Sequence, residues 1–310
     1  MRSDLGSVAA AYDEARRRSR LFRLAAALLE PVYPVRAFLI QAAELFEPSI
    51  RDLGLHAGCR KILDVLPLEW ACRYPSEGEE LVRTAPVLLY GNHPSLLTPF
   101  LVAACVGRDD LHFCSMDYVR RLVPSMGAYC HPLELSLTRS WVEWKRGGFR
   151  RVLAFRLLSL LGSDRSPEAA RETNREALRN AVADLRDGQS VMIIPGGGGK
   201  RNRVWFSGIG VLAKRLIEDP GAPRVYVVPT REENCSNRRV YAMLMRGPVA
   251  RLSRRIRSRR PVRLVFGEPT PLSELVYPAF SVAEAVEALR AHYESTFPPR
   301  RPIGRLRERD

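Results

Sequence analysis

The residues best suited to chemistry stand together at the end of an apolar run. Residues 87–90 are apolar and of strand type, Gly91 interrupts the run, and Asn92 and His93 follow before the chain resumes at Pro94 with a helix-type segment. Open α/β sheets bind their ligands where a strand ends and leads into a helix. An imidazole has an ordinary pKa of about 6.5, so His93 is suited to general base chemistry at neutral pH. The alternative is that His93 is only a hydrogen-bonded histidine at a strand end.

A second polar segment follows another buried strand. Residues 190–194 are typical of a strand in a parallel sheet, and Pro195, four glycines and two cations come next. Backbone N–H groups and cations in such a loop can hold a phosphate or an oxyanion. The spacing of a Walker P-loop is absent, and a flexible surface turn is the alternative. The candidate substrate-binding residues of this loop are Gly196, Gly197, Gly198, Gly199, Lys200 and Arg201.

Alternating helices and strands must position these two segments. This alternation predicts an α/β fold with a mixed, mostly parallel sheet flanked by helices. We predict strands at 86–93, 111–115, 128–133, 190–194, 224–228, 240–245 and 262–266. We predict helices at 8–29, 35–46, 49–65, 96–106, 118–126, 167–187, 207–218 and 281–296. Ser166 and Ser281 are the expected N-caps of two of these helices, the second with a capping box to Glu284.

The pattern divides the chain into three regions. Residues 1–79 form an N-terminal helical region, residues 80–275 the α/β domain, and residues 276–310 a C-terminal helix with a disordered tail. Residues 134–165 combine tryptophan and arginine with an apolar run, which makes them a candidate membrane-facing insertion. A helical insertion packed on the core is the alternative.

The charge balance predicts anionic partners. The formal net charge is +15, and only four of the 49 basic residues are lysines. Phosphorylated substrates and an anionic membrane surface fit this charge, but nucleic acid does not, because no aromatic-interleaved platform or known module accompanies it. No stretch reaches 18 uninterrupted apolar residues, so we expect a cytoplasmic protein that binds peripherally to the inner face of the membrane.

The cysteines predict neither disulfides nor a metal site. The six cysteines form no Cys-x-x-Cys pair and most lie in apolar segments, which fits free thiols in a reducing compartment. His112 and Cys114 could be combined with Cys130 and His131 into a zinc site. Their spacings match no common ligand pattern, so we predict no metal.

The order of these segments resembles the glycerolipid acyltransferase superfamily, which includes the 1-acylglycerol-3-phosphate acyltransferases. That family has a strand that ends in Asn-His, with an aspartate five positions after the histidine, and a later strand that ends in Phe-Pro-Glu-Gly. The resemblance covers about residues 80–275, with Thr98 at the aspartate position and Gly196 at the glutamate position. The matching segments are 91–98, 118–127, 185–197, 206–214, 225–229 and 266–269.

The resemblance implies an activity and its partners. The family transfers a fatty acyl group from acyl-CoA or acyl-carrier protein to a hydroxyl-bearing lipid, such as a lysophospholipid or glycerolipid, without a bound cofactor. It assigns His93 as the general base and Thr98 as the residue that orients it, with Asn92 and the glycine loop on the substrate. Thr98 can accept a hydrogen bond but carries no charge to stabilise an imidazolium. The alternative is therefore a catalytically inactive relative that binds lipid or membrane.

Overall fold

The structure is a computed structural model that describes most of the chain. The described residues are 12–14, 16–17, 20, 23–24, 27, 35–116, 119–120, 123–134, 166–196, 205–245 and 260–298. Most of the predicted helix at 8–29, the candidate insertion after Glu134, most of the glycine loop and the C-terminal tail lie outside them.

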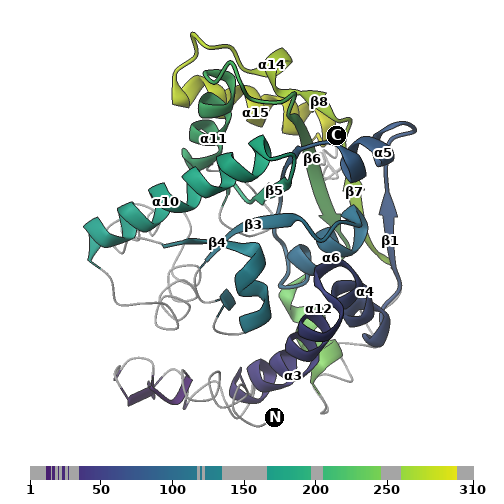
Figure 1. Ribbon diagram of the computed structural model, residues 1–310. Helices are drawn as coiled ribbons and strands as arrows, with labels where there is room; N and C mark the ends of the chain where they lie inside the picture. Colours follow the sequence, from purple (N-terminus) through teal and green to yellow (C-terminus); the bar gives the residue numbers. More distant parts are fainter. Residues whose placement is uncertain are drawn as a thin grey trace, which may run out of the picture.

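A mixed sheet of eight strands forms the centre of the molecule (Figure 1). Its order is β1-β7-β6-β2-β5-β3-β4, and β8 pairs with β6. Neighbouring strands are parallel except where β6 meets β7 and β8. The strands are β1 (Trp70–Arg73), β2 (Val87–Gly91), β3 (Leu111–Met116), β4 (Cys130–Leu133), β5 (Ser190–Ile193), β6 (Tyr226–Glu233), β7 (Val262–Phe266) and β8 (Thr270–Pro271). The predicted mostly parallel α/β fold is confirmed.

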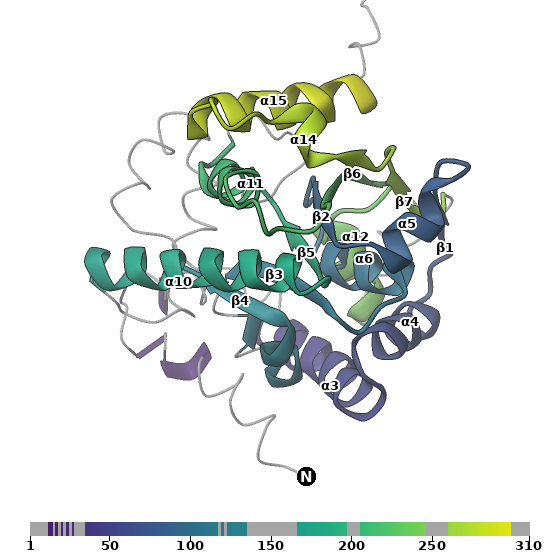
Figure 2. The ribbon, with the colours of Figure 1, turned by 45° about the horizontal axis from the view of Figure 1, so that its top comes forward.

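Helices cover both faces of this sheet. Figure 2 separates the two layers, with α11 and α15 on one side of the strands and α3 and α4 on the other. The first face carries α10 (Pro167–Arg186), α11 (Gly208–Ile217), α14 (Leu272–Leu275) and α15 (Val282–Thr296). The second carries α3 (Val35–Leu53), α4 (Leu55–Val65), α5 (Gly78–Thr84), α6 (Thr98–Val106) and α12 (Asn237–Leu244), and a 3₁₀ helix, η1 (Pro124–Tyr129), precedes β4.

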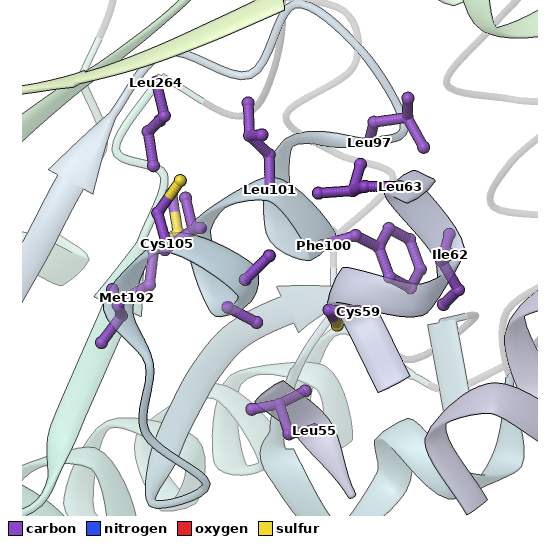
Figure 3. Packing of buried hydrophobic residues seen from close by; sticks show 14 of the residues in the cluster. Leu55, Cys59, Ile62, Leu63, Leu97, Phe100, Leu101, Cys105, Met192 and Leu264 are labelled. Atoms are coloured by element: carbon purple, nitrogen blue, oxygen red, sulfur yellow. The ribbon is translucent and has the colours of Figure 1, made fainter. Parts of the chain in front are cut away.

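Helix α6 is buried because it is apolar around almost its whole circumference. It packs against α4, and Figure 3 shows Phe100 and Leu101 of α6 among Cys59, Ile62 and Leu63 of α4. On the same face the ring centroid of Phe46 in α3 lies 4.4 Å from that of Phe100. This packing fixes the N-terminal end of α6, where Thr98 lies.

Two predictions on this face are wrong, one for a helix boundary and one for a strand. The N-terminal helices were expected to divide before Ser49, but α3 continues through Pro48 to Leu53. The break comes at Gly54, whose φ of 81° lies in the left-handed region that glycine adopts without a steric penalty. The predicted strand at 240–245 is the helix α12, whose buried residues pack on the second face. Its short apolar run fits the residue period of a strand as well as that of a helix, and tertiary packing selects the helix.

The two predicted helix caps, at the starts of α10 and α15, are present. The side chain of Ser166 accepts a hydrogen bond from the backbone N–H of Ala169 at the start of α10. Ser281 and Glu284 form the complete capping box of α15. The fold also includes β1, a strand that was not predicted and that pairs with β7.

The expectation that every cysteine is a free thiol is wrong for two of them. Cys72 in β1 and Cys105 in α6 form a disulfide, although 33 positions separate them in the sequence. The sequence spacing of the two cysteines does not predict this bond, because only the fold brings the edge strand β1 to the end of the buried helix α6. The other four cysteines, Cys59, Cys114, Cys130 and Cys235, are free and buried.

Within the described part of the chain, no helix has both the length and the apolar composition needed to cross a bilayer.

Candidate functional site

Buried polar side chains gather where β2 and β6 end. Nine polar or charged side chains are buried in the described part of the chain, and five of them lie at this edge of the sheet. These five are Asn92, Ser95, Thr98, Thr230 and Glu232. Buried polar groups are unfavourable unless they are hydrogen-bonded, so their concentration at one sheet edge marks the candidate site.

Gly91 allows β2 and β6 to come close at this edge. The two strands are parallel, and Gly91 pairs with Thr230 in the register. A Cβ atom on Gly91 would lie 2.1 Å from the carbonyl oxygen of Thr230, which is a severe overlap with backbone. Only glycine fits here, and it delivers Asn92 directly beside Glu232.

Asn92 extends the strand pairing with its side chain. Its Nδ2 donates to the carbonyl oxygen of Glu232 at 3.1 Å, and its Oδ1 accepts from the backbone N–H of Glu232 at 2.8 Å. The amide therefore satisfies both backbone groups of Glu232 beyond the last ladder pair of the two strands. In this arrangement Asn92 positions the strand ends, and its contact with a substrate remains a prediction.

Glu232 holds the turn between β2 and α6. The hydroxyl of Ser95 donates to Glu232 Oε1 at 2.6 Å. Thr98 Oγ1 lies 2.8 Å from the carbonyl oxygen of Ser95 and is also hydrogen-bonded to Glu232 Oε2. Position 98 itself has no carboxyl group, but Glu232 of β6 contributes one to the same network.

The network has one hydrogen too few for an ionised carboxylate. The hydroxyl of Thr98 carries a single hydrogen and cannot donate to the Ser95 carbonyl and to Glu232 at once. The conflict disappears if Glu232 is protonated and donates to Thr98 Oγ1. Burial raises the pKa of Glu232 above its ordinary value, although hydrogen bonds from Ser95, Thr98 and Cys235 oppose this shift. The geometry therefore favours a protonated Glu232, and burial shifts its pKa in the same direction.

His93 lies beside this network but is not part of it. The residue is partly buried, and its Nδ1 is a buried atom that forms no hydrogen bond with any residue the structure describes. Burial lowers the pKa of His93 to about 4, because the imidazolium would lose its hydration. The imidazole is therefore neutral at physiological pH.

Helix α15 supplies groups that sequence reasoning missed. The hydroxyl of Tyr293 is hydrogen-bonded to the backbone at Asn92, and burial raises the pKa of Tyr293 to about 12. The Tyr293 ring packs edge-on against Trp205, with 5.8 Å between the ring centroids. Arg231 lies over Phe297 at 5.9 Å and lowers the pKa of Tyr293 in opposition to burial. A tyrosine about 200 positions after His93 gives no local sign of this proximity.

The glycine loop begins at the same edge of the sheet. It follows β5, which pairs in parallel with β2 so that Ile193 is opposite Tyr90. The backbone N–H of Phe206 donates to the carbonyl oxygen of Pro195 at 2.9 Å, so the described residues on the two sides of the loop are bonded to each other. Gly196 is described, whereas Gly197, Gly198, Gly199, Lys200 and Arg201 lie outside the described residues.

The chain was compared with protein-family models, with curated proteins and with solved structures. No family model matches it, and no curated protein matches it significantly. Among solved structures it resembles the 1-acyl-sn-glycerophosphate (LPA) acyltransferase PlsC from Thermotoga maritima. The match covers 95% of this chain and 97% of that chain, with 15% identity and a TM-score of 0.41. At this identity and TM-score we infer nothing about function from the match.

Proposed function

We propose that the protein transfers an acyl group from an acyl thioester, acyl-CoA or acyl-carrier protein, to the hydroxyl of a glycerolipid-like acceptor. The proposal rests on one observation above all. A neutral imidazole stands at the end of a central parallel strand, next to a cluster of buried polar side chains in an otherwise apolar sheet. This is the location at which α/β sheets carry their chemistry, and the order of sequence segments resembles an acyltransferase family.

In the proposed step His93 is the general base. A ring nitrogen of His93 takes the proton of the acceptor hydroxyl, while the hydroxyl oxygen forms a bond to the thioester carbonyl carbon. The carbonyl becomes an oxyanion, and the carbon–sulfur bond then breaks as the carbonyl re-forms. The leaving thiolate receives the proton from the imidazolium, which returns His93 to its neutral form. Backbone N–H groups of the loop that begins at Gly196 would stabilise the oxyanion.

Thr98 and Glu232 act in this proposal as one unit. Together they hold the turn that carries His93, because Glu232 binds both Ser95 and Thr98. A protonated Glu232 offers no full negative charge to the imidazolium. We therefore expect the turnover to be slower than that of an enzyme whose histidine bonds an ionised carboxylate, since losing the carboxylate of such a pair lowers turnover by up to roughly 10⁴-fold.

The charge of the chain supports a peripheral position at an anionic membrane. The net charge of +15 comes mostly from arginine, whose guanidinium forms paired hydrogen bonds with phosphate. In the proposal, lipid headgroups and the phosphates of the acyl carrier are the anionic partners.

The test is acyl transfer by the purified chain with His93→Gln as the key variant. Labelled acyl-CoA or acyl-carrier protein is incubated with vesicles that contain lysophospholipids, and acylated lipid is separated and counted. We expect His93→Gln to lower kcat/KM by about 10²- to 10⁴-fold, the usual contribution of a general base. His56→Gln is the matched control, because His56 lies on α4 and bonds the backbone of Ala103.

Two results would overturn parts of the proposal. Turnover that is unchanged in a folded His93→Gln variant would remove His93 from the reaction. Saturable binding of lysolipid or acyl-CoA without any turnover would identify a lipid-binding protein with the fold and without the chemistry.

A further inference from the structure

Two histidines and one aspartate converge on the opposite face of the sheet from the Glu232 network. They are His112 of β3, His131 of β4 and Asp184 of α10. The side chains of all three are mostly buried, with exposed fractions of 19%, 12% and 17%. Each offers one ligand atom, and these three atoms lie within 4.8 Å of one another.

The fold places the three side chains on one face. Strand β3 pairs in parallel with β4, with Cys114 opposite His131, so His112 and His131 project to the same side of the sheet. Helix α10 packs across this side, with Ala181 and Leu185 in its core cluster. Asp184 lies between them in the sequence and meets both imidazoles.

One carboxylate oxygen is shared between the two rings. His131 Nε2 lies 2.5 Å from Asp184 Oδ2, and His112 Nδ1 lies 3.1 Å from the same oxygen. The two imidazole centroids are 5.3 Å apart. Although it is near the carboxylate, the buried Nδ1 of His112 makes no well-directed hydrogen bond among the described residues.

The spacing and the donor atoms suit a zinc-type cation. Bonds of about 2.0–2.1 Å to imidazole and carboxylate place tetrahedral ligand atoms about 3.3 Å apart. The 3.1 Å separation is within about 0.2 Å of this value, and the 2.5 Å contact needs to open by about 0.8 Å. The two imidazole nitrogens lie within 4.8 Å of each other, so they need to approach by at most about 1.5 Å. Two imidazoles with one carboxylate form a donor set that divalent zinc and its neighbours favour.

We propose that His112, His131 and Asp184 bind one divalent transition-metal ion of the zinc type. The ion would connect α10 to β3 and to the edge strand β4, in place of direct histidine–carboxylate contacts. The zinc site that the sequence suggested combined these two histidines with Cys114 and Cys130, and its spacings led to the prediction of no metal. Asp184 lies more than 50 positions after His131, and only the packing of α10 brings it to the pair.

The experiment measures metal binding by the full chain. Protein freed of metal with a chelator is titrated with Zn²⁺ and, separately, with Co²⁺ as a spectroscopic probe. We expect one Zn²⁺ per chain and weak visible Co²⁺ bands without a thiolate charge-transfer band. The Asp184→Asn and His131→Gln variants should bind at least about 100-fold more weakly, because even supporting residues of metal sites contribute 10- to 100-fold. His56→Gln should bind like the wild type.

A second measurement uses only the wild-type protein, in case the variants do not fold. Diethyl pyrocarbonate modifies accessible imidazoles, and mass spectrometry reports each site. Zn²⁺ should slow modification of His112 and His131 and leave that of His56 unchanged. The proposal is wrong if no saturable binding occurs, if a thiolate charge-transfer band shows that the metal binds cysteine, or if Zn²⁺ protects neither histidine.

Discussion

At the scale of single residues, burial governs the imidazole of His93. Its pKa falls to about 4 while an unfolded histidine titrates near its ordinary value of about 6.5. The folded state therefore holds neutral His93 over a pH range in which the unfolded chain takes up a proton. The same property lets His93 act as a base at neutral pH, although the low pKa makes it a weak one.

This difference predicts a loss of stability in mild acid. The unfolded state binds the extra proton as the pH falls from about 6.5 to about 4, so the free energy of unfolding decreases over that window. The difference between a folded pKa of about 4 and an unfolded pKa of about 6.5 corresponds to about 3 kcal/mol of stability, all of it present above pH about 6.5. Urea unfolding at a series of pH values measures it.

The variant His93→Gln isolates this contribution. It cannot titrate, so its stability should fall less steeply with acid than that of the wild type. The lowered pKa of His292 acts in the same direction in both proteins and cancels in the comparison. Parallel pH profiles for wild type and His93→Gln would mean that His93 is not buried as a neutral group.

At the scale of elements, Glu232 of β6 joins the end of β2 to the start of α6, more than 130 positions earlier in the sequence. Its backbone is bound by Asn92 at the end of β2, and its side chain is bound by Ser95 and by Thr98 at the start of α6. A neutral carboxyl satisfies both contacts of Thr98 Oγ1 at once. The contact between β2, β6 and α6 therefore depends on a carboxyl group that both accepts and donates hydrogen bonds.

Two substitutions of Glu232 should differ in their effect on stability. Glutamine has the same shape and can donate to Thr98 while it accepts from Ser95, so Glu232→Gln should change the free energy of unfolding by less than about 1 kcal/mol. Glu232→Ala leaves buried hydroxyls without partners and opens a cavity, so it should cost about 3 kcal/mol. Denaturant unfolding of both variants measures the difference.

Glu233→Gln is the control for the element-scale prediction, because Glu233 is the next residue and its carboxylate is 3.6 Å from Arg231 on the other side of the strand. It should behave like an ordinary partly exposed ion pair, with an effect below about 1 kcal/mol. If Glu232→Gln is as damaging as Glu232→Ala, the carboxyl is ionised and the hydrogen assignment is wrong.

At the scale of the whole molecule, the Cys72–Cys105 disulfide connects the edge of the sheet to its most buried helix. The bond closes a loop across a sequence separation of 33. Loop closure of this length restricts the unfolded chain by about 3 to 4 kcal/mol. Reduction should therefore lower the free energy of unfolding of the wild type by about that amount.

The control is a variant whose stability the reductant should not change. A Cys72→Ala/Cys105→Ala variant should be insensitive to dithiothreitol and close in stability to the reduced wild type. Six free thiols in the non-reduced protein, counted by alkylation and mass spectrometry, would contradict the bond. The same count would restore the prediction that all the cysteines are thiols.

Much of the fold could be predicted because it follows from local patterns. Strands such as β2 and β5 are short, fully buried and almost entirely apolar runs, and α10 has a serine cap, an initial proline and a regular buried stripe. Local patterns predicted the wrong element where the same residues are compatible with two kinds of secondary structure. The apolar residues of α12 fit a short strand as well as a helix turn, and α3 continues through Pro48, past its predicted end at Phe46.

The sequence alone determined the position of His93, at the end of a central strand, because Gly91 and Pro94 confine the polar residues between a strand and a helix. It also determined that position 98 lacks a carboxylate. Only the tertiary structure decided that Glu232 supplies a carboxyl to that position, and that Asp184 joins His112 and His131. Each of these carboxyl groups comes from a segment more than 50 positions away, and contacts of that kind depend on strand order and helix packing, which no local pattern encodes.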